Sequence, residues 1–178
     1  ATGLNEDQYV ASEDGHLVAY EKEDPSKSKS VTVMNLETDQ EYEVTCKDGE
    51  CIKPLGFMDG DFVYGVAKTE EVGTTLSGAQ VIPMYKVEIT SSKDKVIKTY
   101  EQSGIYVLSA TFEDNMITLD RAIKDGDTYT GTAQDYITSS KEAKESNIYV
   151  QTYKTDLKET QVRLTYDDGI SDKEPKLL

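Results

Sequence analysis

Short segments in which apolar and polar residues alternate run through the chain, and polar stretches separate them. Residues 41–46 read Glu-Tyr-Glu-Val-Thr-Cys, and residues 84–89 read Met-Tyr-Lys-Val-Glu-Ile. A period of two places successive side chains on opposite faces of a β-strand, so that one face is buried and the other meets water. The pattern therefore predicts an all-β fold of short antiparallel strands.

A turn that contains an aspartate recurs between pairs of these segments. It occurs as Asp14-Gly15, Asp59-Gly60 and Asp114-Asn115, and each copy is followed by the start of an apolar segment. Asp-Gly and Asp-Asn pairs tolerate the positive φ angles that tight hairpin turns require. Each copy predicts a strand–turn–strand hairpin, and three copies predict a repeated structural unit.

The spacing of the elements supports a repeat. From each turn aspartate to the third strand of its unit, at residues 31, 84 and 148, the chain runs 17, 25 and 34 residues. From that strand to the next turn aspartate it runs 28 and 30 residues. One segment is nearly constant and the other varies, as expected for stacked four-stranded units with one loop free to lengthen. We expect units at residues 8–50, 51–104 and 105–166, with 167–178 as the start of a further unit or an edge strand.

The units resemble the β-propeller blades of the TolB-like family. The residues that carry the resemblance are Pro54, Phe57, Asp59-Gly60, Phe62-Val63-Tyr64 and Met84-Tyr85-Lys86-Val87. The first and third units match this motif less fully. The resemblance implies one β-propeller-like domain over residues 1–178, with about three four-stranded antiparallel blades. Similar blades occur in prolyl-oligopeptidase-type peptidases and in envelope proteins, so the resemblance implies a fold rather than an activity.

Three blades are fewer than the four to eight of closed propellers. The resemblance therefore implies an incomplete propeller. Either the chain is part of a longer protein, or two copies associate as a homodimer that completes or caps the open blade edges. The resemblance also implies a bacterial protein that is secreted or belongs to the cell envelope, and we expect an extracytoplasmic location.

The charge of the chain narrows the classes of partner. Lys and Arg number 19 and Asp and Glu number 34, so the net charge is −15 and the pI is about 4.4. This charge repels nucleic acid and anionic lipid. No apolar run approaches the roughly 20 residues of a membrane-spanning helix. We expect neither nucleic-acid binding nor membrane insertion.

The two cysteines flank a turn, and the segment reads Cys46-Lys47-Asp48-Gly49-Glu50-Cys51. If Asp48-Gly49 is a two-residue hairpin loop, Cys46 and Cys51 face each other with Cα atoms about 4.5 Å apart. A disulfide can bridge that distance. The alternative is a pair of reduced thiols at a junction between units. Because the chain has only these two cysteines and His16, we expect no metal site and no cofactor.

Catalytic motifs are missing from the sequence. It contains no Gly-x-Ser-x-Gly nucleophile elbow, and no spacing singles out a carboxylate pair among its 34 acidic residues. Asp125-Gly126-Asp127 places acids beside a glycine, but the later ligands of an EF-hand loop do not follow. We expect a protein that is not an enzyme.

Binding is the function that the pattern favours. In a four-stranded meander, the variable segments 21–30, 66–83 and 121–147 emerge at one end, and variable loops on rigid sheets are a common binding design. The third segment combines aromatic rings with hydrogen-bond acceptors. Its expected ligand-binding residues are Asp125, Asp127, Tyr129, Asp135 and Tyr136. The alternative is an insertion that binds nothing.

We therefore expect a non-enzymatic binding or scaffold module that recognises a protein or a small ligand on its loop face. One alternative is a small-ligand or glycan sensor domain, although the lack of Trp weakens a sugar-stacking interpretation. A second alternative is the non-catalytic gating domain of a larger peptidase.

Overall fold

Strands form nearly all of the regular structure. The computed structural model describes residues 4–92, 95–113, 115–139, 148–155 and 158–166. Within these ranges the only helical segments are two short 3-10 turns, η1 (Glu6–Gln8) and η2 (Thr69–Glu71). The chain divides into a unit over residues 1–141 and a unit over residues 142–178. The expected all-β, antiparallel fold class is confirmed.

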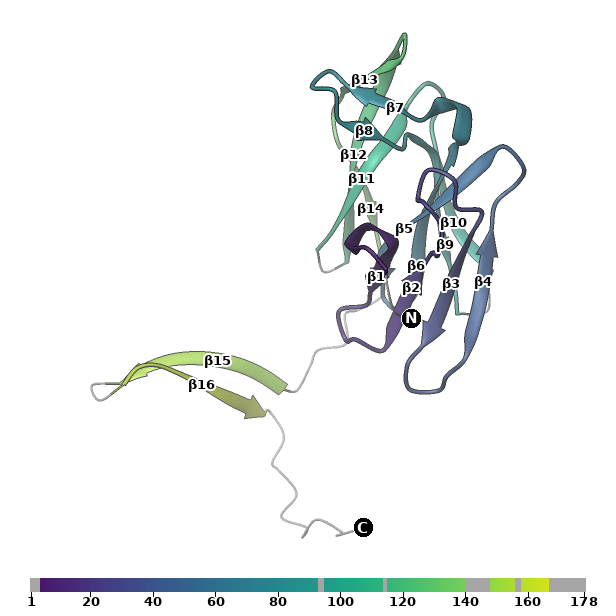
Figure 1. Cartoon of the computed structure of the whole chain (residues 1–178). Coiled ribbons are helices and arrows are strands. Elements are labelled where there is room, and N and C mark those ends of the chain that lie inside the picture. Colours follow the sequence, from purple (N-terminus) through teal and green to yellow (C-terminus); the bar gives the residue numbers. More distant parts are fainter. Residues whose placement is uncertain (1–3, 93–94, 114, 140–147, 156–157, 167–178) are drawn as a thin grey trace. The chain divides into compact units, whose positions relative to one another are not determined.

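The first sheet is a four-stranded antiparallel meander, in the order β1-β2-β3-β4 (Figure 1). The strands are β1 (Tyr9–Ala11), β2 (Leu17–Tyr20), β3 (Ser30–Asn35) and β4 (Glu41–Thr45). The carboxylate of Asp14 organises the first turn, because it accepts hydrogen bonds from the Ser12 hydroxyl (2.6 Å) and the His16 amide (3.0 Å). Gly15 then takes the left-handed conformation with φ of 72°. The first predicted hairpin is thus present.

The second meander has the order β5-β6-β9-β10. Its strands are β5 (Glu50–Met58), β6 (Asp61–Lys68), β9 (Met84–Thr90) and β10 (Val96–Glu101). The β5–β6 turn is the predicted two-residue turn, since Met58 pairs with Asp61 and both central residues, Asp59 and Gly60, have positive φ (54° and 79°). The two strands between residues 66 and 83 are β7 (Gly73–Thr75) and β8 (Gln80–Val81).

The third unit differs from the expected meander. Its strands within residues 105–139 are β11 (Tyr106–Glu113), β12 (Met116–Asp125), β13 (Thr128–Gly131) and β14 (Asp135–Thr138). β11 and β12 form the predicted hairpin, and one bridge between Val107 and Met84 joins β11 to β9. β13 and β14 both pair with β12. They occupy the edge of β12 at which residues 148–153 were expected to pair as the third strand of this unit.

The remaining strands form a separate hairpin. β15 (Ile148–Thr155) and β16 (Lys158–Tyr166) pair with each other as a two-stranded sheet in the unit that spans residues 142–178. The expectation that residues 148–153 and 161–165 complete a sheet begun by β11 and β12 is therefore wrong as a strand assignment. The segment 167–178, expected to begin a further unit, lies outside the described residues.

The two long variable segments are tied to each other. β13 pairs in parallel with β7, with Thr128 opposite Thr74 and Tyr129 opposite Thr75. In Figure 1, β7, β8 and β13 lie at the upper end of the part that spans residues 1–141, and the connection between β2 and β3 turns below them, at the upper end of the first sheet. We call this the loop end. The expectation that the three variable segments gather at one end is met only in part, because β14 of the third segment pairs with Met116–Leu119, at the opposite end of β12.

Two hydrophobic clusters cover the two faces of the β5-β6-β9 sheet. β6 alternates between them, since Phe62, Tyr64 and Val66 belong to one cluster and Val63 and Ala67 to the other. The first cluster also takes buried residues from β2, β3 and β4, and the second takes them from β11, β12 and β14. The middle strands are thus buried on both faces, between β1-β2-β3-β4 on one side and β11, β12 and β14 on the other. The bridge from β9 to β11 makes these last strands part of the same ten-stranded sheet as β5, β6 and β9.

In the second and third repeats, a phenylalanine two residues before the turn aspartate packs into one of these two clusters. Phe57 packs into the cluster shared with the first sheet, and its ring centroid lies 5.5 Å from that of Phe62. Phe112 packs into the other cluster, with its ring against the backbone of Gly56 in β5. Phe112 therefore contacts the unit that precedes its own, and Phe57 packs into the cluster that its unit shares with the first sheet.

Candidate ligand pocket at the loop end

A hollow of about 260 Å³ opens at the loop end, between the second repeat (β5 to β10) and the third (β11 to β14). It lies where β6 and β10 end and where β9 and β11 begin. Its lining combines two tyrosines, two carboxylates and one ammonium group with the turn between β10 and β11. The lining residues are Lys68, Glu71, Tyr85, Glu101, Gln102, Ser103, Gly104, Ile105 and Tyr106. We call this hollow the loop-end pocket.

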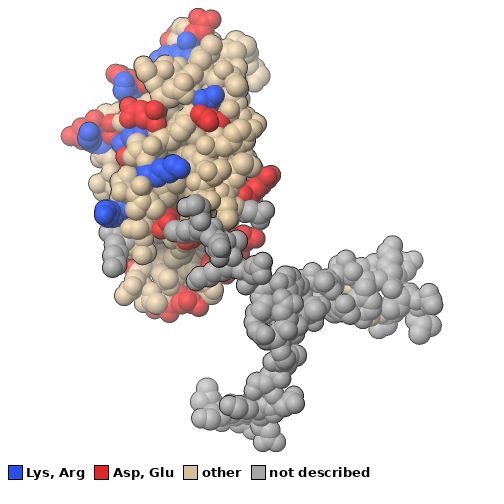
Figure 2. All heavy atoms as spheres, turned by 180° about the vertical axis from the view of Figure 1, so that it is seen from behind, with Lys and Arg blue, Asp and Glu red and all other residues tan. Residues whose placement is uncertain are grey.

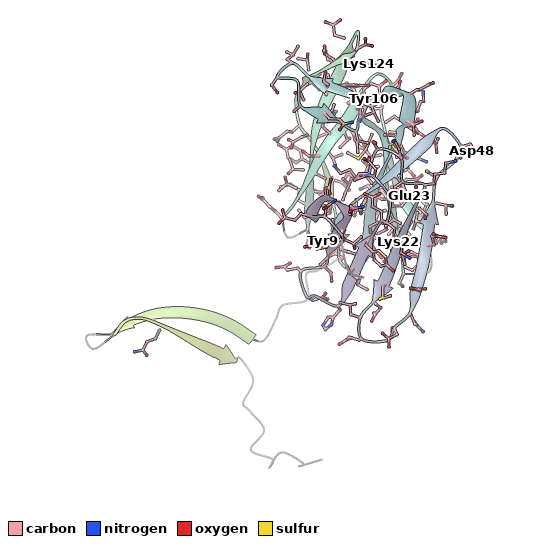
Figure 3. All side chains as sticks on the ribbon, in the orientation of Figure 1. Tyr9, Lys22, Glu23, Asp48, Tyr106 and Lys124 are labelled. Atoms are coloured by element: carbon pink, nitrogen blue, oxygen red, sulfur yellow. The ribbon has the colours of Figure 1, made fainter. Side chains whose placement is uncertain are left out.

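One wall of the pocket is held by hydrogen bonds to Glu71. The hydroxyl of Tyr106 donates to Glu71 Oε1 (3.1 Å), and the hydroxyl of Tyr129 donates to the backbone carbonyl of Glu71 (2.8 Å). The Tyr106 and Tyr129 rings meet edge to face, with centroids 5.3 Å apart. Tyr106 and Lys124 are labelled at this end of the molecule in Figure 3, and Lys124 Nζ lies 4.0 Å from Glu71 Oε1. The second carboxylate oxygen, Glu71 Oε2, is buried without a hydrogen-bond partner.

The opposite wall is formed by Tyr85 at the start of β9. Its hydroxyl donates to Glu50 Oε1 (2.8 Å), and Lys68 Nζ lies 6.0 Å from the centre of its ring. Burial and the bond to Glu50 raise the pKa of Tyr85. Burial and the bond to Glu71 likewise raise the pKa of Tyr106. Both phenols therefore stay protonated and act as hydrogen-bond donors at physiological pH.

The turn at the base of the pocket is anchored by Arg121 of β12. Its Nη1 donates to Gln102 Oε1 (2.9 Å), to the hydroxyl of Tyr100 (3.1 Å) and to Asp135 Oδ2 (3.0 Å). Its Nε donates to the carbonyl of Ala133 (2.7 Å). These bonds join the end of β10 to β12 and β14, so they fix the turn that lines the pocket.

A second, smaller hollow of about 190 Å³ lies beside the connection between β2 and β3. Its lining is more polar and includes Lys22 and Glu23, which Figure 3 labels. Lys22 Nζ lies 5.9 Å from the centre of the Tyr20 ring. Its other walls are Ser, Thr, Lys and Glu side chains. This hollow therefore offers a ligand only the partly covered ring of Tyr20, whereas the loop-end pocket offers two tyrosine rings.

The structure separates the ligand-binding residues expected from the sequence. Asp125 and Asp127 are exposed at the tip between β12 and β13. Tyr129 is only 2% exposed, and burial raises its pKa to about 12. Its ring supports Tyr106 from behind. Tyr129 therefore positions the wall of the pocket and does not present a free aromatic face.

The other two expected residues lie on β14. Asp135 accepts hydrogen bonds from Tyr100 and Arg121, and the bonds from the Tyr136 amide and Tyr100, together with the charge of Arg121, lower its pKa. Tyr136 is 53% exposed on the same strand. The five residues thus form a tip, a supporting ring and a salt bridge, and they do not enclose one site.

Both cysteines are free thiols in this structure. The hairpin geometry on which the possible disulfide rested is wrong, because Cys46 follows β4 of the first sheet and Cys51 lies in β5 of the second. The Cys46 amide donates to the carbonyl of Lys29 and not across a β4–β5 hairpin. Burial raises the pKa of both thiols, that of Cys51 to about 11. Both are therefore poor nucleophiles.

The described part of the chain shows no other candidate centre for chemistry. His16 is exposed in the first turn, with Nδ1 3.2 Å from Glu37 Oε1. Among the described residues no three His, Cys, Asp or Glu side chains are grouped as metal ligands. No described helix has the length and apolar character needed to cross a membrane.

The residues of the loop-end pocket were not singled out by the sequence. Tyr85 belongs to the apolar-Tyr-x-Val segment, and Tyr106 lies in the segment expected to open the third unit. Both were assigned to strands, but their meeting depends on the packing of β9 against β11. A tyrosine at the first or second position of a strand is the signal that could have found them. Comparison of the chain with protein-family models and with curated proteins finds no match.

Proposed function

We propose that this chain is a non-catalytic binding module that recognises its partner with the loop-end pocket. In this proposal the scaffold is a set of propeller-like blades of the TolB-like kind, and the parent protein is a secreted or envelope protein of a bacterium. The partner is a protein segment or a small ligand that inserts between Tyr85 and Tyr106.

The arrangement of the sheets supports the blade interpretation. β1-β2-β3-β4 and β5-β6-β9-β10 are successive four-stranded antiparallel meanders, as blades are. Their faces are buried against each other, and the repeated rings of Phe57 and Phe112 each pack toward the preceding unit. A stack of this kind holds its end connections rigidly, which is what a binding surface made of loops requires.

One observation carries the binding proposal: Tyr85 and Tyr106, from two different units, line one hollow beside a buried carboxylate oxygen without a partner. Tyrosines offer a large contact area with little loss of side-chain entropy, and they are enriched where proteins bind partners. The hydrogen bonds to Glu50 and Glu71 hold both rings in place before a ligand arrives. A preorganised site of this kind loses less free energy on binding.

The charge of the chain constrains the partner. The net charge of −15 disfavours polyanions, and on the face shown in Figure 2 acidic and basic side chains are interspersed without a continuous basic area among the described residues. Glu71 and Glu101 line the pocket beside Lys68. A neutral or cationic group fits this lining better than a phosphate does.

The test is a peptide and glycan array probed with the wild-type chain and with tyrosine variants. We expect Tyr85→Ala and Tyr106→Ala each to weaken binding of the best array ligand by about 10-fold or more, as aromatic hot spots do. Tyr136→Ala, which removes an exposed ring outside the pocket, is the matched control and should leave binding unchanged. Tyr85→Phe keeps the ring and reports on the hydroxyl alone.

The array also separates the two kinds of ligand. Selection of peptides supports a protein-recognition module, and selection of glycans supports a sensor domain that uses the same pocket. Binding that survives in both alanine variants, or that is lost in Tyr136→Ala, would contradict the proposed site.

A further inference from the structure

The connection between β2 and β3 contains a buried carboxyl group that the proposed function does not use. Glu21 is 1% exposed, and neither Oε1 nor Oε2 has a hydrogen-bond partner. It directly follows β2, where the chain leaves the first sheet and turns over the start of the second. A buried polar group without a partner is costly, so its presence at a junction between two sheets requires a physical role.

Charged and titratable groups approach Glu21 from each element packed around it. Asp7 of η1 and Asp24 of the connection itself disfavour its charge, whereas Lys53 of β5 favours it. The thiol of Cys51, also on β5, is close enough for the charge of Glu21 to raise the pKa of that thiol. Two carboxylates thus act against one lysine.

Burial is the main influence on this carboxyl group. It raises the pKa of Glu21 to about 7, and the nearby Ser28 and Lys53 offset only part of this effect. Ser28 is itself buried, and its hydroxyl donates to the carbonyl of Ser30 (3.0 Å). The neutral form of Glu21 is therefore favoured in the closed structure, and the charged form is favoured in water.

Backbone bonds around Glu21 fasten the connection to its neighbours. The Ile52 amide of β5 donates to the carbonyl of Ser28 (2.9 Å), and the Glu21 amide donates to the carbonyl of Gln8 (2.9 Å). The Gln8 side chain donates to the carbonyl of Glu23 (2.8 Å). These three bonds hold both ends of the connection against β5 and η1.

We propose that the β2–β3 connection is a proton-operated latch, which is closed on β5 while Glu21 is neutral and opens when Glu21 releases its proton to solvent. Opening breaks the bond from the Ile52 amide to Ser28 and admits water to Cys51. The latch is formed by the β2–β3 connection and β5, and it does not include the pocket residues Tyr106 and Glu71. It therefore regulates access to the junction between the first two sheets, beyond the binding proposed for the loop-end pocket.

Amide hydrogen exchange at Ile52, followed by NMR, tests this latch. The rate in the wild-type chain is divided by the rate in Glu21→Gln at pH 5.5 and at pH 8.5, so that the intrinsic pH dependence of exchange cancels. We expect this ratio to rise by about 10-fold or more with pH, because a one-unit difference in pKa between closed and open states is a factor of ten. Glu21→Met serves as the reference if the Gln variant does not fold.

Glu23→Gln is the matched control, because Glu23 is an exposed glutamate on the same connection. We expect the wild-type pH dependence in this variant. Thiol labelling of Cys51 in a Cys46→Ser background gives a second readout. The labelling rate with Glu21 present is divided by the rate with Glu21→Gln, and we expect this ratio to be larger at pH 8.5 than at pH 5.5. A ratio that stays within twofold across this range would overturn the latch.

Discussion

At the scale of single residues, close contacts between units determine which substitutions the fold accepts. Gly65 of β6 is the clearest case, because a Cβ built there overlaps Met84 Sδ and lies 2.6 Å from Met84 Cγ. Met84 is fully buried and belongs to the cluster between β9 and β11. The absent side chain at residue 65 is therefore what allows Met84 to fill this space.

Gly65→Ala should lower the free energy of unfolding by about 1–3 kcal/mol, the usual effect of overpacking a core. Urea unfolding followed by circular dichroism measures it. Gly131→Ala is the control, since nothing lies within 4 Å of a Cβ at that position. If the two variants lose the same amount of stability, the contact between Gly65 and Met84 is not what limits this site.

Arg121 gives a second prediction at this scale. Its side chain is 14% exposed, and its two nitrogens bond to groups from β10, β14 and the segment before β14. Arg121→Lys keeps the charge but loses the planar fork of donors. We expect a loss of about 0.5–1.5 kcal/mol, typical of losing a hydrogen bond whose acceptor stays accessible to water. Thermal unfolding checks it, and a variant as stable as the wild type would show that charge alone suffices.

At the scale of elements, local turn chemistry was predictable from the sequence and non-local strand pairing was not. Asp59-Gly60 specifies its own turn, because both residues adopt positive φ without help from distant parts of the chain. β13 and β14 instead depend on the free edge of β12 and, for β13, on β7. Their sequence reads as polar loop, apart from the buried Tyr129 and Ile137.

The candidate site was predictable only in its general position. The spacing of the units placed the variable segments at one end of the sheets. β7, β8 and β13 lie there, whereas β14 runs along the opposite end of β12. The individual residues depend on contacts that cross units, such as the bond from Tyr106 to Glu71, which are 35 positions apart in the chain. An aromatic ring in a variable segment cannot be recognised from sequence as a buried support, which is why Tyr129 was expected to face a ligand.

The repeated phenylalanine supplies the prediction for elements. Phe112→Ala removes a ring that packs on Gly56 of the preceding unit, and Phe57→Ala removes the equivalent ring one unit earlier. Each should cost about 2–4 kcal/mol, somewhat less than a fully buried Phe because both rings are partly exposed. Leu76→Ala, at a side chain 75% exposed, is the control for chemical unfolding. An effect of Phe57→Ala or Phe112→Ala no larger than that of Leu76→Ala would show that these rings do not join the units.

At the scale of the whole molecule, open strand edges determine how copies of the chain meet. Among the described strands, β10 pairs only with β9, and Val96 and Ile97 on it are 44% and 51% exposed. The edge strand β4 instead carries the exposed charges of Glu41 and Glu43, which protect an edge from pairing. Association of two copies is therefore expected at β10.

Sedimentation velocity over a range of protein concentrations tests this association. The wild-type chain should form a dimer as concentration rises, and Ile97→Lys should remain a monomer because it places a charge on the pairing edge. Leu36→Lys, at another exposed apolar side chain, should behave as the wild type does. A wild-type chain that stays monomeric at the highest concentration would exclude the homodimer.

The most direct test of the proposed binding function can be made before any natural ligand is identified. Amide NMR spectra of the intact chain are recorded with a library of small neutral and cationic fragments. Shift changes should concentrate on the pocket residues Lys68, Glu71, Tyr85 and 101–106, and Tyr85→Ala should abolish them. Changes that gather at Asp125, Asp127 and Tyr136, or that spread evenly over the surface, would contradict a binding site at the loop-end pocket.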